Sequence, residues 1–189
     1  MGLSKQVEAS SKEKTVSHSF RVNEEALRKI NEDARTENVS VNTFVNQLLM
    51  TYANFDRLVH PFGMIKITLP TFRRILNASS EKGAEETGKW AGANVSKAFQ
   101  IADYGTISLV TVREYFKTWA VNGGFFQYNE RIIGNKLIVT FNHELGRNGT
   151  NFLKGYAMSA FRGADVEIKP TSSTEGSISF EIPSQTSLS

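Results

Sequence analysis

Apolar and polar side chains alternate strictly along the chain between residues 15 and 22. One side of the alternation carries Val16, His18, Phe20 and Val22, and the other side carries Thr15, Ser17, Ser19 and Arg21. A period of two residues is typical of a β-strand with one buried face. We therefore predict a short strand with an apolar face and a polar face, preceded by a flexible polar arm at residues 1–14.

Two amphipathic helices are predicted directly after this strand. Asn23 precedes two carboxylates, the pattern of a helix N-cap, and apolar side chains then recur at helical spacing as far as Ala34. A second start signal lies at residues 40–43, and apolar positions at helical spacing continue from there towards Leu58. The order strand, helix, helix is thus complete between residues 15 and 58.

A second domain is predicted at residues 61–182, because Pro61 and Gly63 disfavour a continuous helix. Its expected elements are a strand at 64–69, a helix from Pro70 through Asn77, a helical stretch at 81–101 weakened by three glycines, a helix at 108–121, a hairpin at 125–141, a helix at 151–161, and a second hairpin from 166–169 and 177–182. The predicted fold class is α+β, with antiparallel hairpins in the C-terminal domain and a tail at 183–189.

Composition narrows the chemistry of this 189-residue chain, in which 40% of the residues are hydrophobic and the formal net charge is +3. The absence of cysteine excludes disulfides and thiolate metal sites. His143, Glu144, Asp103, Glu114 and Glu130 have no spacing that fixes a catalytic set, and the three histidines have no metal-ligand spacing. We therefore expect no enzyme activity, no metal site and no cofactor.

The stretch from Ser17 to about Phe55 resembles the ribbon-helix-helix family of prokaryotic repressors, which includes Arc, MetJ and CopG. The marks are the alternation at 18–22, the helix start at 23–25, and the entry into a long second helix at 40–43. The resemblance implies an intertwined homodimer in which one strand from each subunit forms a ribbon that enters the DNA major groove. His18 departs from the family pattern, because an apolar residue is more usual on the core-facing side.

The resemblance also implies roles for individual residues. The polar face of the ribbon would contact bases through Ser17, Ser19 and Arg21, and Arg21 is the strongest candidate because a guanidinium can donate twice to a guanine edge. The start of the second helix would contact DNA phosphates through Ser40, Val41, Asn42 and Thr43. The dimer core would contain Phe20, Val22, Leu27, Ile30, Phe44, Val45 and Leu48.

These patterns favour a transcriptional repressor that binds double-stranded DNA as a homodimer or a higher even oligomer. The alternatives are a plasmid or chromosome partition factor, a viral architectural DNA-binding protein, an antitoxin with a toxin-binding C-terminal region, and a packing module without a DNA role. The C-terminal aromatics are expected mainly in a core, although some could line the cavity of a small-molecule effector. Since no apolar stretch suits a signal peptide or a membrane span, we expect a cytoplasmic, nucleoid-associated protein without membrane contact.

Overall fold

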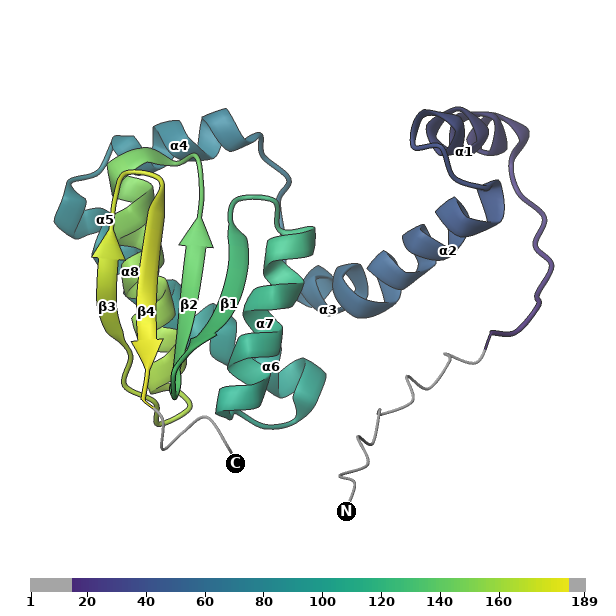
Figure 1. The fold of residues 1–189 in the computed structure, drawn as a ribbon. Coiled ribbons are helices and arrows are strands. Elements are labelled where there is room, and N and C mark those ends of the chain that lie inside the picture. Colours follow the sequence, from purple (N-terminus) through teal and green to yellow (C-terminus); the bar gives the residue numbers. More distant parts are fainter. Residues whose placement is uncertain (1–14, 184–189) are drawn as a thin grey trace, which may run out of the picture. The chain divides into compact units, whose positions relative to one another are not determined.

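The computed structural model describes residues 15–183, and its architecture is α+β, as the sequence predicts (Figure 1). The chain divides into two compact units, of which the first ends at Gln47 and the second begins at Leu48. We call the described part of the first, residues 15–47, the N-terminal unit and residues 48–183 the C-terminal unit. The predicted arm at 1–14 and all but the first residue of the predicted tail at 183–189 lie outside the described residues.

The N-terminal unit contains two helices whose starts agree with the sequence prediction. Helix α1 (Glu24–Thr36) is capped by the side chain of Asn23, which accepts a hydrogen bond from the Ala26 N–H. Helix α2 (Val41–Thr51) begins after Ser40, whose hydroxyl accepts from the Thr43 N–H at 3.1 Å. Both caps satisfy backbone donors that have no partner inside the helix.

The predicted N-terminal strand is not found in this structure. Residues 15–23 form no regular secondary structure, and the strands of the described chain all lie after residue 126. A β-strand requires backbone hydrogen bonds to a neighbouring strand. The observed sheet within the single chain does not include residues 15–22, so the sequence pattern alone was insufficient to predict a strand there.

The C-terminal unit begins before the boundary that the sequence predicted at His60–Gly63. After α2 the chain continues through a π-helical turn, η1 (Tyr52–Asp56), into α3 (Arg57–Val59) and the 3₁₀ turn η2 (His60–Phe62). Phe55, Leu58 and Val59 are buried in the core of this unit. These side chains make the end of the long helical segment part of the second unit.

Residues 64–68 form no strand, contrary to the prediction for 64–69. The side chain of Thr68 instead caps α4 (Leu69–Asn77), and Pro70 occupies its first turn as predicted. The predicted helical stretch that follows is confirmed as α5 (Glu81–Ala91), the π-helical turn η3 (Gly92–Ser96) and α6 (Lys97–Tyr104). The helix predicted at 108–121 is confirmed as α7 (Leu109–Asn122), which begins with a capping box at Ser108.

Glycines in α5 and at the start of η3, which weaken the helical pattern, allow close packing against α8 (Gly146–Arg162). A Cβ atom at Gly88 would overlap the carbonyl oxygen of Phe152, and one at Gly92 would overlap that of Tyr156. From the opposite helix, a Cβ at Gly155 would overlap the carbonyl oxygen of Glu85. The glycines therefore lower helix propensity locally, and in exchange they let the two backbones approach each other.

The sheet is antiparallel and has the order β1-β2-β4-β3 (Figure 1). The first predicted hairpin is confirmed as β1 (Gln127–Ile133) and β2 (Lys136–Asn142). The second hairpin is present, but its first strand is β3 (Lys169–Ser173), later than predicted, and it pairs with β4 (Ser177–Ile182). Every second residue of β2 and β4 is buried. These side chains pack with aromatic side chains of α7 and α8 in one core.

Candidate nucleic-acid interface

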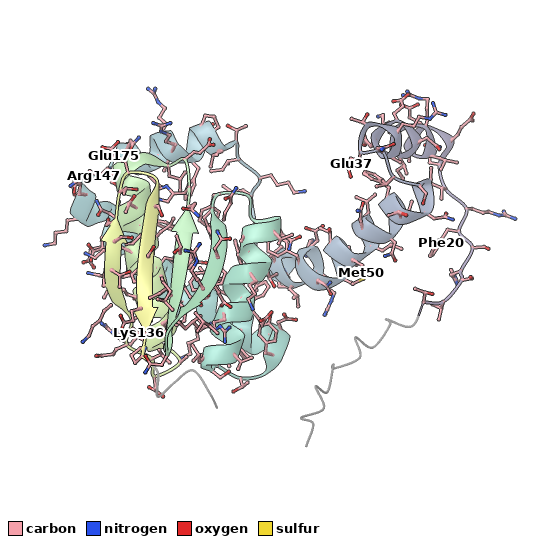
Figure 2. The ribbon with its side chains drawn as sticks, in the orientation of Figure 1. Phe20, Glu37, Met50, Lys136, Arg147 and Glu175 are labelled. Atoms are coloured by element: carbon pink, nitrogen blue, oxygen red, sulfur yellow. The ribbon has the colours of Figure 1, made fainter. Side chains whose placement is uncertain are left out.

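The three predicted base-contacting side chains lie in the irregular stretch before α1. Ser17, Ser19 and Arg21 are all exposed, and they alternate with exposed apolar residues. Phe20 projects from this stretch with 65% of its surface exposed (Figure 2), and its ring contacts only that of His18 among the described aromatic pairs. The Arg21 guanidinium and the hydroxyls of Ser17 and Ser19 are therefore exposed and free to contact an external ligand.

The predicted phosphate-contacting residues form the first turn of α2. The hydroxyls of Ser40 and Thr43 lie 2.8 Å apart, and both side chains are exposed. The first amides of any helix lack intrahelical acceptors, and the positive end of the helix dipole favours an anion. Ser40 occupies the Thr43 amide, which leaves the amides of Val41 and Asn42 as the backbone donors suited to a phosphate oxygen.

Charges on α1 are largely neutralised within the helix. The Arg28 guanidinium donates to Glu25 and to Glu32 at 2.6 Å each, and Lys29 lies 3.4 Å from Glu25. The hydrogen bond from Arg28 lowers the pKa of the Glu25 carboxyl below its ordinary value. Arg21, outside the helix, is thus better placed to contact an external anion than the cations of this network.

The predicted dimer core is not a core within one chain. Ala34 is the only buried residue of the N-terminal unit as described, whereas Leu27 is 41% exposed and Val22 is 53% exposed. Ile30, Phe44 and Val45 are half-buried. Leu48 belongs to the C-terminal unit and is also exposed. The apolar stripe predicted from the sequence exists, but a single chain does not bury it.

Two of the residues considered for catalysis, Glu114 and Glu130, lie in one ion-pair cluster, in which Lys117 is near both carboxylates. Arg113 of α7 donates twice to Glu130 of β1 at 2.7 Å, and Tyr128 donates to the same carboxylate. Glu114 pairs with Lys117. Arg113 and Tyr128 together lower the pKa of Glu130 against the opposing effect of burial. This cluster ties the edge strand to α7.

His143 lies in a different network, at the connection between β2 and α8. Its Nδ1 accepts from the Leu145 N–H at 3.1 Å, and its Nε2 lies 3.1 Å from the Thr150 hydroxyl. Since that hydroxyl donates to the Thr174 carbonyl, Nε2 carries the proton and His143 is neutral. Burial lowers the pKa of His143 in agreement with this arrangement.

The C-terminal aromatics are mostly core residues, as the sequence predicts. Tyr115, Phe116, Trp119 and Phe126 are buried, whereas Trp90 is 63% exposed. A cavity of about 760 Å³ lies in the C-terminal unit, bordered by residues 64–67 and the end of α7, and three of the aromatics considered as cavity walls, Phe72, Trp119 and Phe125, line it. The apolar run Met64-Ile65-Lys66-Ile67, for which the sequence predicts a strand, forms one border of this cavity.

Comparison with models of known protein families and with curated proteins finds no match to this chain. Between residues 15 and 183, no group of three or more acidic, histidine or cysteine side chains is placed to hold a metal ion. In the same part of the chain, no helix combines the length and the apolar character needed to cross a bilayer.

Proposed function

We propose that residues 15–58 form a ribbon-helix-helix dimer and that the protein is a sequence-specific DNA-binding regulator that acts as a repressor. The observation that carries the proposal is that the N-terminal unit encloses almost nothing by itself. Two capped helices and an apolar stripe are present, yet Ala34 is the only buried residue among residues 15–47. A unit with well-formed helix starts and no core needs a partner that supplies the core.

A second copy of the chain meets this need. Burying a large apolar side chain contributes roughly 1.5–3 kcal/mol, and Phe20, Val22 and Leu27 are all exposed in one chain. The alternation at residues 15–22 also gives two copies a matching pair of edges, so that each strand supplies the backbone partners of the other. Antiparallel pairing would place Phe20 and Val22 on the helix side and Arg21 on the opposite side.

The opposite side of such a ribbon has the chemistry of a base-reading surface. Arg21 can donate two hydrogen bonds to the O6 and N7 atoms of guanine, a contact worth roughly 1–3 kcal/mol of discrimination between bases. Ser17 and Ser19 can donate or accept, and the first turn of α2 offers amides and hydroxyls to the flanking phosphates. In this proposal the ribbon recognises the bases, and the first turn of α2 binds the phosphates that position the protein on the DNA.

The test is selection of binding sites from a random DNA pool with the purified full-length protein. Wild type should enrich a motif with two-fold symmetry. The Arg21→Ala variant should lose the preference at one base pair in each half-site, by about tenfold to a hundredfold, while remaining a dimer. Arg131→Ala removes the same charge from an exposed position on β1 and serves as the matched control, with an unchanged motif.

Four outcomes would contradict the proposal. Equal enrichment by wild type and Arg21→Ala would remove this residue from base reading. A monomer by analytical ultracentrifugation at the concentration that binds DNA would exclude the shared ribbon. If random DNA competes for binding as well as the selected motif does, the protein is an architectural DNA-binding protein and not a sequence-specific regulator. Footprints that spread over many repeats would indicate a partition factor.

A further inference from the structure

We infer that the C-terminal unit makes a second contact with double-stranded DNA, through a basic surface on and before α4 that binds phosphates. This α4 basic surface consists of Lys66, Arg73 and Arg74. The inference rests on the proposed DNA-binding function and adds to it contacts outside residues 15–58. Such contacts raise the affinity for DNA of any sequence, because phosphates carry no direct information about the bases.

The charge of this part of the chain has one sign. Residues 57–80 contain Arg57, Lys66, Arg73 and Arg74 and no Asp or Glu, although the whole chain has 22 Lys and Arg against 19 Asp and Glu. The three cations of the α4 basic surface are exposed, and within the described part of the chain none of them forms an ion pair. Their charges are therefore available to an external polyanion.

Acidic side chains of the elements around α4 do not neutralise this surface. Glu81, at the start of α5, pairs with Arg147 at 3.1 Å and accepts a hydrogen bond from Asn151. Glu144 and Glu175 lie in the loops before α8 and between β3 and β4, and among residues 15–183 neither forms an ion pair with α4. Arg147 is thus neutralised, whereas the cations of α4 are not.

The packing of α4 presents its two arginines to solvent. Figure 1 shows this helix at the end of the sheet where β2 leads into α8. The α4 side chains that contact the core recur at helical spacing and are Leu69, Phe72 and Leu76. Arg74 is therefore on the opposite side of the helix. The Arg73 guanidinium lies beside Gly146, where a Cβ atom would be 3.9 Å from its Nε, so the positive end of the α8 dipole adds to its potential.

Helix capping does not account for these cations. An arginine in the last turn of a helix often interacts with the terminal carbonyls. At the end of α4, however, the Asn148 side chain donates to the carbonyls of Leu76 and Ser79 at 3.0 Å each, and the Ser79 hydroxyl also donates to Leu76. These acceptors have partners without Arg74, which leaves its guanidinium available for a ligand.

Double-stranded DNA is the polyanion that fits this surface best. A duplex carries one negative charge per roughly 1.7 Å of its axis, and a guanidinium can bind a phosphate through two parallel hydrogen bonds. Single strands are usually held by base stacking on aromatic side chains. The aromatic residue of α4, Phe72, packs instead against Phe125 and Phe152. The surface therefore offers charge without a stacking platform.

The test is the salt dependence of binding by the full-length protein to a duplex that carries the selected motif. Each phosphate contact contributes about 0.9 to the slope of log affinity against log salt concentration. The Arg73→Gln/Arg74→Gln variant should reduce this slope by up to about 4 if a dimer loses both contacts from each subunit. It should bind selected and random duplexes about tenfold or more weakly, with an unchanged base preference.

Two further variants serve as controls. Arg162→Gln/Lys169→Gln removes the same charge from exposed positions at the end of α8 and the start of β3, and it should keep the wild-type slope. Arg73→Lys/Arg74→Lys retains the charge of α4 and should keep most of the slope. The lysine variant separates loss of charge from any change in the packing of α4.

A second measurement reports proximity directly, because the chain has no cysteine. Arg74→Cys labelled with a photoactivated cross-linker should form a covalent adduct with the bound duplex. Lys169→Cys with the same label, at an exposed position of β3, should form none.

The outcomes separate this inference from the proposed function. Retained duplex binding with equal slopes for wild type and Arg73→Gln/Arg74→Gln would overturn the inference alone, and so would equal effects of the two glutamine variants. An unchanged slope on duplex DNA together with weaker binding of single-stranded RNA would assign the surface to another nucleic acid and would also overturn it. Absence of binding to any duplex by wild type would overturn both proposals.

Discussion

Single polar residues in this protein act mainly as connectors between elements, and His143 is the clearest example. Its two ring nitrogens have different roles, one accepting from the Leu145 amide and the other contacting Thr150. Only the neutral ring can do both, because protonation removes the acceptor at Nδ1. The stability of the β2–α8 connection is therefore linked to the protonation state of one side chain.

This linkage predicts a pH dependence of stability. Because burial lowers the pKa of His143, the unfolded state takes up the proton first as the pH falls. The contribution is fully present above the unfolded pKa of about 6.5 and is lost progressively as the pH falls towards the lower folded pKa. Urea unfolding between about pH 8 and pH 5 should show this loss in wild type.

The His143→Asn variant provides the comparison, since its amide oxygen can replace Nδ1 without titrating. It should be less stable than wild type at about pH 8 and should show a weaker pH dependence below about pH 6.5. His60→Gln changes an exposed histidine and should retain the wild-type slope. An unchanged slope in His143→Asn would assign the pH dependence to other groups.

At the scale of elements, the close approach of the α5 and α8 backbones determines which substitutions α5 tolerates. Gly88→Ala places a methyl group against the Phe152 carbonyl oxygen, which cannot move without displacing α8. We expect a loss of roughly 3 kcal/mol or more in the free energy of unfolding, despite the gain in helix propensity. Chemical denaturation of the purified variant measures this loss.

Gly83→Ala is the matched control in the same helix. A Cβ there meets only side-chain atoms of Ser79 and Ser80, at 3.3 Å or more. Its stability should stay within about 1 kcal/mol of wild type. Equal effects of the two alanines would mean that propensity, and not the close approach of α5 and α8, determines the outcome.

The elements that could be predicted from sequence are those with local signals. Asn23 and Ser40 predict helix starts through their caps, apolar spacing predicts the helix at 108–121, and the Gly134-Asn135 pair predicts the turn of the first hairpin. The run at 64–67 has the composition of a strand, but no partner strand is available, and Thr68 with Pro70 starts a helix instead. The pairing of strands distant in sequence and the shape of a cavity depend on long-range contacts, which local patterns do not specify.

In the candidate DNA interface, too, the features set by neighbouring residues could be predicted from sequence, whereas the feature that needs a second chain is not seen in one chain. The N-cap at Ser40 and the exposure of Arg21 follow from local pattern and are present in the structure. The ribbon itself requires another chain, and its apolar face at Phe20 and Val22 is exposed in one chain. The part of the site that remains a proposal is therefore the part that depends on a second subunit.

At the scale of the whole molecule, the two units should differ in how their stability depends on concentration. The C-terminal unit has an extensive core of its own, whereas residues 15–47 bury only Ala34. Amides of α1 should therefore exchange with deuterium faster in dilute samples than in concentrated ones, because a dimer supplies their protection. Hydrogen-exchange mass spectrometry across a dilution series measures this difference.

Amides of α8, which lie in the C-terminal core, serve as the internal reference and should be protected at every concentration. Phe20→Ser should shift the protection of α1 to higher concentrations without affecting α8. Protection of α1 that is strong and independent of concentration would show that a single chain stabilises the N-terminal unit, and a shared core would then be unnecessary.

The two borders of the sheet also differ in their openness to additional strands. β3 is one border strand, and it carries Pro170, which has no N–H to donate, together with an irregular register between Pro170 and Ser172. Proline and bulges are features that hinder edge-to-edge aggregation. At the other border, β1 has neither, and it presents Ile132 and Ile133 to solvent. Misassembly of partly unfolded molecules should consequently proceed from the β1 border, and a proline in that strand would be the natural means of suppressing it.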